Sequence, residues 1–212
     1  EADAVIGEDS VIEAQAYVGA GVVVGPATHI GPGARLLPGT RLGQDVVVGA
    51  GSVLGSAGFG HLEPDSKGYR AAIPQRGGVS VGDGTQIGAL CTIDRGTLGD
   101  TRLGKQVRVD NLVQLGHNSV VEDCAVLVAQ VGISGSSQIG RGAVLAGQSG
   151  VADHRRVGRG AVLLARAAAF RDVPDDVVYG GNPARPRNEW MRQQAVLHRL
   201  ARKGQSKEED PT

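Results

Sequence analysis

The sequence has very few aromatic and cysteine residues. Among 212 residues, 3% are Phe, Trp or Tyr, and only two, Cys91 and Cys124, are cysteines. Because aromatic side chains are scarce, the core must draw its buried area from Val, Ile, Leu and Ala. Two cysteines do not make a disulfide framework or a metal site, and a reducing compartment is the simpler expectation. We therefore expect a cytoplasmic protein whose core consists of narrow, regular layers.

The sequence also lacks an excess of either charge and lacks long apolar runs. It has 22 basic and 22 acidic residues, so its formal net charge is zero. Nucleic-acid-binding proteins usually have a positive excess, and this class is therefore not expected. No apolar run reaches the about 18 residues that a membrane span needs, and no charged segment precedes a short apolar one as in a secretory signal. We expect neither a nucleic-acid partner nor a membrane span.

The chain contains a repeat with a period of six residues. Aliphatic residues occupy every sixth position from Ile6 to Leu54, from Val81 to Ile93 and from Leu103 to Leu163, and Gly follows many of them. Helices show spacings of three and four, and strands a spacing of two, so neither explains this period. Hexapeptide repeats are typical of a parallel β-helix, in which three repeats close one coil. The pattern predicts a three-sided prism with aliphatic residues on its axis, and a β-sandwich would not keep this period.

The interruptions of the repeat predict the domain organisation. The β-helix is expected over residues 1–171, with an inserted loop at 56–78 that loses the period and contains Phe59 and Tyr69. A smaller interruption at 94–100 predicts a bulged corner. Beyond the repeat, we expect a connecting turn at 172–186, a helix at 187–203 and a disordered tail at 204–212. The inserted loop is either a tolerated surface insertion or a lid over a site.

The period places a histidine and a glycine next to each other on the outer surface. His117 follows the inward Leu115 by two residues, and Gly135 lies one coil later in the chain. Stacked coils lie about 4.8 Å apart, so the two residues should be neighbours, and His154, two coils and one residue beyond His117, is expected in the same column. A histidine can accept a proton from a nucleophile, and a glycine N–H can stabilise an oxyanion. This pair predicts a site for acyl transfer.

Two other interpretations of these histidines remain open. An outward histidine on a β-helix is often only a solvated side chain. The second histidine in the same column counts in favour of the catalytic interpretation, and the two interpretations then stand on an equal footing. A metal site at His117 and His154 lacks a third ligand at a suitable spacing, so no metal is expected. Neither cysteine is placed as a nucleophile.

Four segments make the sequence resemble a known family. They are "IDRGTLGDT" (93–101), "DNLVQLGHNSV" (110–120), "LVAQVGISGS" (127–136) and "PARPRNEWMR" (183–192). The chain is similar over residues 1–203 to the UDP-3-O-acylglucosamine N-acyltransferases of lipid A synthesis. The resemblance implies a left-handed β-helix that forms a homotrimer. It also implies transfer of a 3-hydroxyacyl chain from acyl carrier protein to the 2-amino group of a UDP-sugar acceptor, without a cofactor.

The resemblance also implies roles for individual residues. The general base of the family falls on His117, and its oxyanion-binding N–H falls on Gly135. The second histidine of its pocket falls on His154. Further positions that line the sites of donor and acceptor are Asp110, Asn111, Gln114 and Asn118, of which Asp110 is expected to orient the base.

The sequence departs from the family in three places. Asp153 stands where the family usually has glycine, and Ala57 replaces an acidic residue. The family's uridine-binding domain is absent ahead of the β-helix, so we expect these residues to be the catalytic and trimerising part of a longer enzyme.

Arginines near the end of the repeat suggest a surface for an acidic carrier protein. They are Arg155, Arg156, Arg159 and Arg166, and they add to the basic residues of 184–203, which are Arg185, Arg187, Arg192, Arg199, Arg202 and Lys203. The alternative is ordinary solvated surface charge.

Two rival functions are kept. One is a related β-helix acyltransferase that uses acetyl-CoA on another amino- or hydroxy-sugar. The other is a trimeric scaffold without catalysis. The identity of the donor separates the first rival from the proposed family, and the effect of replacing His117 tests the second.

Overall fold

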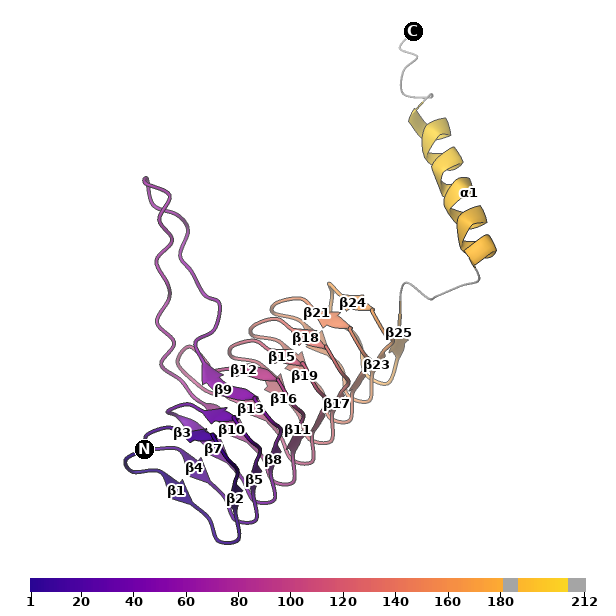
Figure 1. The fold of residues 1–212 in the computed structure, drawn as a ribbon. Coiled ribbons are helices and arrows are strands. Elements are labelled where there is room, and N and C mark those ends of the chain that lie inside the picture. The colour runs from indigo at the N-terminus through magenta and orange to yellow at the C-terminus, as the bar shows by residue number, and fades with distance from the viewer. Residues whose placement is uncertain (181–186, 206–212) are drawn as a thin grey trace. The chain divides into compact units, whose positions relative to one another are not determined.

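The chain forms a parallel β-helix, followed by a single helix, in a computed structural model (Figure 1). The structure describes residues 1–180 and 187–205, and it describes side chains in 1–180 and 191–200. Two compact units are present, Glu1–Gly181 and Asn182–Thr212. The prediction of a left-handed parallel β-helix with a short C-terminal helical region is confirmed.

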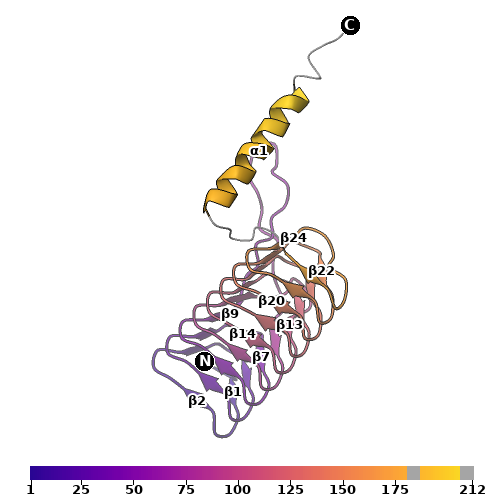
Figure 2. The ribbon, with the colours of Figure 1, turned by 90° about the vertical axis from the view of Figure 1, so that its right-hand side faces the viewer.

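Three parallel sheets form the sides of the prism. The first contains β1 (Val5–Ile6), β4 (Val23–Val24), β7 (Thr40–Leu42), β10 (Val79–Val81), β13 (Thr101–Leu103), β16 (Val120–Val121), β19 (Gln138–Ile139) and β22 (Arg156–Val157). The second contains β2 (Val11–Ile12), β5 (His29–Ile30), β8 (Val47–Val48), β11 (Gln86–Ile87), β14 (Arg108–Val109), β17 (Val126–Leu127), β20 (Val144–Leu145), β23 (Val162–Leu163) and β25 (Val178–Tyr179). The third contains β3 (Tyr17–Val18), β6 (Arg35–Leu36), β9 (Val53–Ser56), β12 (Thr92–Asp94), β15 (Gln114–Leu115), β18 (Gly132–Ile133), β21 (Gly150–Val151) and β24 (Ala168–Ala169). The coils stack in chain order, as Figure 2 shows from a second side.

The aliphatic residues of the repeat fill the axis of the prism. Leu54, Leu115 and Ile133 are each at most 1% exposed, whereas the outward residue before each of them faces solvent or a groove. The first coil differs, because its inward residues Ile6 and Ile12 remain 43% and 39% exposed. No coil covers them on the side toward the N-terminus in the described part of the chain. Stacking on both sides is therefore what buries an inward side chain in this fold.

The two interruptions expected from the sequence appear as insertions at corners. Partners in regular coils are 18 residues apart, as Val5 and Val23 are. Thr40 instead pairs with Val79, because the loop at 56–78 leaves the prism between β9 and β10. Val79 pairs with Thr101 across the shorter insertion at 94–100. The strands on either side resume the same inward register, so neither insertion disturbs the core.

The repeat extends further than the aliphatic pattern suggests. Strand β24 places Ala169 inward, and β25 pairs with β23 within the segment expected to be only a connecting turn. Alanine is too small to stand out in an aliphatic periodicity, although it fills the narrow axis here. The predicted tail at 204–212 lies outside the described residues from 206 onward, and residues 204 and 205 belong to the helix.

The second unit contains α1, which spans Arg187–Gln205. Its described side chains are exposed, and the apolar ones among them are Met191, Val196, Leu197 and Leu200. No helix in the described residues is long and apolar enough to cross a membrane.

Candidate active site

A groove of about 1060 Å³ runs along the third sheet, where the inserted loop meets the later coils. Its floor follows the outward positions of successive strands, which are Gln114, Gly132, Gly150 and Ala168. Glycine and alanine at these positions leave the face of the sheet hollow. Phe59 and Ile73 from the inserted loop and Phe170 beyond β24 add apolar lining. The groove therefore combines an apolar channel with a corner that holds polar groups.

His117 and Gly135 meet at that corner, as the period predicts. A β-carbon built on Gly135 would lie 2.7 Å from Nε2 of His117 and 2.8 Å from its Cε1. The imidazole edge therefore rests directly against the Gly135 backbone, and no side chain fits there. The carbonyl of His117 accepts a hydrogen bond from the N–H of Ser136 (2.7 Å), which fixes the two corners relative to each other. Among the described residues, no acceptor binds the N–H of Gly135, a residue that lines the groove.

The inserted loop covers the other side of the imidazole. A β-carbon on Gly58 would lie 2.6 Å from Cβ of His117 and 2.7 Å from its Cδ2. Gly58 therefore lets the loop approach the ring more closely than any other residue would. Sequence reasoning missed this contact, because a loop outside the period gives no indication of where it returns. The contact favours the lid interpretation of the loop over that of a simple surface insertion.

Asn118 orients the ring from its Nδ1 side. Its Nδ2 lies 2.8 Å from Nδ1 of His117 and 2.9 Å from Oγ1 of Thr97. Its Oδ1 accepts a hydrogen bond from the backbone N–H of Thr97 (2.7 Å). Asn118 has a positive φ of 59°, a conformation that asparagine adopts more readily than most residues. The sequence places Asn118 among the substrate-lining residues, whereas in the chain its amide contacts the histidine.

Asp94 is a second functional candidate that sequence reasoning missed. It lines the groove at the end of β12, and its carboxylate accepts hydrogen bonds from Oγ of Ser56 (2.8 Å) and from Nε2 of Gln114 (3.0 Å). Burial raises the pKa of the Asp94 carboxyl, and these two hydrogen bonds and the nearby charge of His117 partly offset the increase. Asp94 directly follows the inward Ile93 in "IDRGT", but the period gives no indication that its carboxyl is buried.

Gln114 lies in the groove as expected and bridges two neighbours. Besides donating to Asp94, its Oε1 accepts a hydrogen bond from the hydroxyl of Thr92. Both ends of the Gln114 amide therefore have a hydrogen-bond partner. This fixes the amide beside the acidic side of the groove.

Asp110 and Asn111 lie at a different corner of the same coil. The Asp110 carboxylate accepts hydrogen bonds from the N–H groups of Asn111 (2.7 Å) and Ala129 (3.1 Å). Asn111 in turn accepts one from the N–H of Ala89 (2.7 Å). The expectation that Asp110 orients His117 is wrong within one chain, because its carboxylate caps the corner between the second and third sheets. A role in substrate binding for these two residues stays a prediction.

His154 lines the groove, but not in the column expected for it. Its N–H donates to the carbonyl of Gly135 (3.1 Å), and its φ of 55° matches the positive φ of Asn118 and Ser136. By this register His154 continues the column of Asn118 and Ser136, and Asp153 continues that of His117 and Gly135. The exposed carboxylate of Asp153 is therefore the charged group one coil beyond the free N–H.

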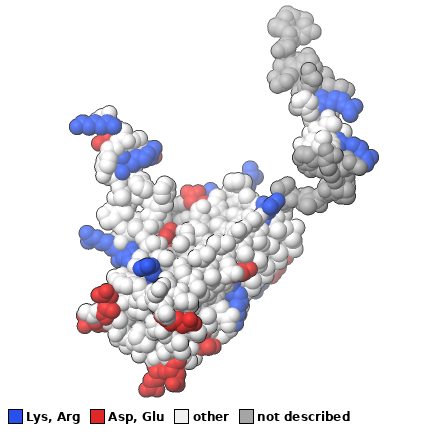
Figure 3. All heavy atoms as spheres, in the orientation of Figure 1, with Lys and Arg blue, Asp and Glu red and all other residues white. Residues whose placement is uncertain are grey.

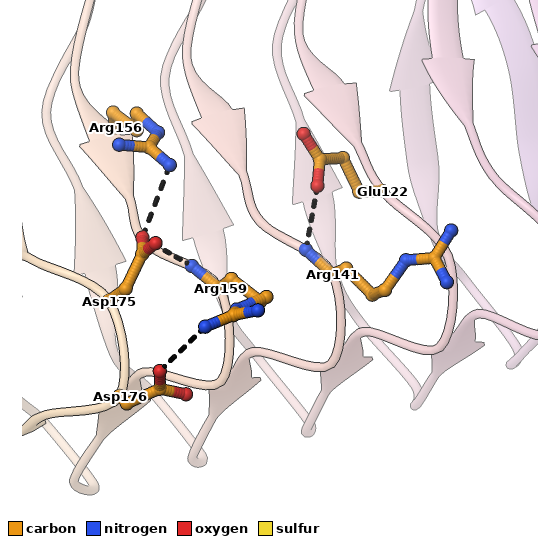
Figure 4. A network of polar contacts seen from close by, with 6 residues as sticks. All are labelled: Glu122, Arg141, Arg156, Arg159, Asp175 and Asp176. Atoms are coloured by element: carbon orange, nitrogen blue, oxygen red, sulfur yellow. Dashed lines mark hydrogen bonds and ion pairs between the residues drawn. The ribbon is translucent and has the colours of Figure 1, made fainter.

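Charges are unevenly distributed over the β-helix. Figure 3 shows acidic side chains over the first coils, and Lys and Arg at the tip of the inserted loop. The arginines of the last coils are only partly free. Arg156 pairs with Asp175 (3.1 Å) and Arg159 with Asp176 (3.0 Å), as Figure 4 shows. Exposed pairs of this kind stabilise little, but they neutralise part of the basic surface expected for a carrier protein.

The described residues contain no cluster of three or more His, Cys, Asp or Glu side chains that could hold a metal ion. Cys91 is buried, which raises the pKa of its thiol, and Cys124 is exposed outside the groove.

The fold and the corner at His117 define a β-helix built from hexapeptide repeats. Residues 3–37 and 21–56 match the model of the family described as bacterial transferase hexapeptide (six repeats). Two solved UDP-N-acetylglucosamine acyltransferases share this fold. The protein from Bacteroides fragilis has a TM-score of 0.77 at 23% identity, over 85% of this chain and 68% of its own. The protein from Campylobacter jejuni has a TM-score of 0.74 at 24% identity, over 86% of this chain and 69% of its own.

Sequence relatives are more specific. A UDP-3-O-acylglucosamine N-acyltransferase from Syntrophus aciditrophicus is 50% identical over 151 residues, which are 71% of this chain and 41% of the relative. The protein of that name from Caulobacter vibrioides is 48% identical over 158 residues, 74% of this chain and 46% of the relative. The chain is a homologue of the UDP-3-O-acylglucosamine N-acyltransferases, and it spans less than half the length of these relatives.

Proposed function

We propose that this β-helix is the catalytic part of an N-acyltransferase of lipid A synthesis. In this reaction, a 3-hydroxyacyl chain moves from acyl carrier protein to the 2-amino group of UDP-3-O-acylglucosamine. The observation that carries the proposal is the imidazole of His117 against the unbonded N–H of Gly135. The names of homologues up to 50% identical support the same reaction.

The chemistry at the corner follows from this arrangement. The acceptor amine attacks the thioester carbonyl carbon, and its C–N bond forms as the carbonyl oxygen gains negative charge. The Gly135 N–H donates to that oxygen, an interaction typically worth about 3 kcal/mol in the transition state. His117 removes the proton from the attacking nitrogen, and the C–S bond then breaks. The proton passes from the imidazolium to the departing thiolate, which restores the neutral ring.

The remaining groove residues have supporting roles in this proposal. The channel from Gln114 over Gly132 and Gly150 to Ala168 extends for three strand spacings, about 14 Å, and its apolar lining suits an acyl chain or the arm of the donor. His154 and Asp94 also line the groove, and in this proposal they contact the sugar. In a homotrimer, a neighbouring chain would supply a further wall of the groove.

The test is an acyl-transfer assay with matched donors and acceptors. Purified protein is incubated with 3-hydroxyacyl carrier protein or acetyl-CoA, each with UDP-3-O-acylglucosamine or another amino- or hydroxy-sugar nucleotide. The proposal expects an amide product, identified by mass spectrometry, only with the carrier protein and the UDP-glucosamine acceptor. Product with acetyl-CoA would support the rival acyltransferase. Absence of product from every pair, with the fold intact by circular dichroism, would favour a scaffold.

A further inference from the structure

A line of hydrogen bonds connects the inserted loop to His117. Thr97 Oγ1 donates to Oε1 of Gln75, a residue of the loop (2.8 Å), and accepts from Nδ2 of Asn118 (2.9 Å). The same Nδ2 lies 2.8 Å from Nδ1 of His117. Gln75, Thr97, Asn118 and His117 are all partly buried, so solvent competes only weakly for these groups. The loop therefore reaches the ring in two ways, directly through Gly58 and indirectly through this relay of hydrogen bonds.

The orientation of the Asn118 amide is fixed by the backbone of Thr97. An N–H group can only donate, so the atom of Asn118 that lies 2.7 Å from the Thr97 nitrogen must be the acceptor Oδ1. The donor Nδ2 consequently faces His117, whose Nδ1 must accept. A neutral imidazole has one protonated nitrogen, and here the proton belongs on Nε2. That is the nitrogen that faces Gly135 and that a base would need to have free.

We infer that Asn118 determines which nitrogen of His117 carries the proton, and that Thr97, itself bonded to Gln75, holds Asn118 in place. In the arrangement seen here the proton is on Nε2, so His117 cannot act as a base at that nitrogen. Reversal of the Asn118 amide presents Oδ1 to Nδ1, which takes a proton from solvent as Nε2 releases one. The Thr97 N–H loses its acceptor in this step, so the loop and the 94–100 corner resist the reversal. Asn118, Thr97 and Gln75 are positioning residues in this account, which rests on the proposed role of His117.

The test reads the protonated nitrogen directly. Long-range ¹H–¹⁵N correlation spectra of histidine-labelled protein distinguish the two neutral forms without any substrate. The chain has five histidines, and a His117→Gln variant assigns the signals of His117. At a pH above the titration of the ring, we expect the proton on Nε2. A proton on Nδ1 in the unliganded protein would overturn the inference.

Asn118→Asp is the sharpest variant, because it retains the shape and also tolerates a positive φ. One carboxylate oxygen still accepts from the Thr97 N–H, and the other can only accept from His117. The proton is therefore expected to move to Nδ1. An unchanged spectrum in this variant, with the fold intact, would contradict the relay.

Two threonine variants separate the relay from a general loss of structure. Thr97→Val removes the hydroxyl that binds Nδ2 and is expected to raise the population with the proton on Nδ1. Thr101→Val removes a hydroxyl that binds only the backbone N–H of Asn118 (2.9 Å). It should lower stability and leave the proton on Nε2. Equal spectra for the two variants would refute the assignment of Thr97 as a positioning residue.

Kinetics provide a second readout, which depends on the proposed activity. In Asn118→Asp the carboxylate favours the imidazolium, so the acidic limb of the kcat/KM profile should move to higher pH. The other titratable groups facing His117 are Asp94, His61, Asp153 and His154, and none of them is altered by the variant. Thr97→Val favours the form with the proton on Nδ1, so it should raise kcat about 3- to 10-fold, the equivalent of one hydrogen bond, with little change in KM. An acidic limb that does not move would count against the relay, whereas a protein without transferase activity still gives the spectroscopic answer.

Discussion

Replacing Gly135 with alanine tests the closeness of the histidine and the free N–H. The new methyl group would lie 2.7 Å from Nε2 of His117, and ordinary van der Waals contact begins at 3.4 Å. The ring must therefore retreat by about 0.7 Å. Gly58 and Asn118 occupy its other sides, so the retreat also disturbs the loop and the relay. Gly135 does not have a positive φ, so alanine introduces no backbone strain at this position.

A misplacement of about 1 Å at a reacting group can cost about 100-fold in rate, so we expect kcat of Gly135→Ala to fall about 10- to 100-fold. The ring is partly exposed, and the free energy of unfolding should change by less than about 1 kcal/mol. The assay is initial-rate acyl transfer, with denaturant unfolding measured in parallel. Gly147→Ala is the matched control, because its methyl group would lie 3.5 Å or more from its neighbours at a corner outside the groove. Gly135→Ala with more than half of the wild-type kcat would refute the geometry of the corner.

Three further predictions follow from the loop, the buried carboxyl and the open groove. Gly58→Ala should displace the loop, because its methyl group would lie 2.6 Å from Cβ of His117; limited proteolysis within 61–72 should accelerate, and an unchanged digestion pattern would contradict the packing. The pKa of Asp94 is raised in the folded state, so folding is favoured below the pKa of the unfolded carboxyl, and this contribution is lost as pH rises through the folded value. The free energy of unfolding of Asp94→Asn should therefore rise relative to that of the wild type as the pH increases above about 4, and a difference independent of pH would disprove the burial argument. The protein should sediment as a trimer at micromolar concentration, because a neighbouring chain is expected to form the second wall of the groove. Sedimentation as a monomer would contradict this prediction.

The β-helix could be predicted well because the inward positions repeat with a strict period. Leu115 and Ile133 are adjacent on the axis for the same reason that His117 and Gly135 are adjacent on the surface. The period also predicts which outward residues are neighbours, because residues 18 positions apart lie on adjacent coils. The spacing of His117 and Gly135 is therefore enough to predict that these two residues meet.

Contacts made by the loop could not be predicted in this way. Gly58 contacts the histidine, and Gln75 contacts Thr97, because of the path that residues 56–78 take, and that path has no period. The relay through Asn118 was missed for a different reason. It depends on which end of an amide faces a backbone N–H, a choice that residue type leaves open. The shift of His154 by one position was visible in the spacing, but its consequence required the positive φ at that corner.

The central claim is that His117 accepts the proton of the acceptor amine beside Gly135. The most direct measurement is the rate of amide formation by His117→Gln, which occupies similar space but cannot take up a proton near neutral pH. Unfolding and sedimentation confirm that fold and assembly match those of the wild type. Loss of a general base typically costs about 10²- to 10⁴-fold, and we expect a decrease in this range in kcat. A His117→Gln protein that forms the amide within about two-fold of the wild-type rate would contradict the account.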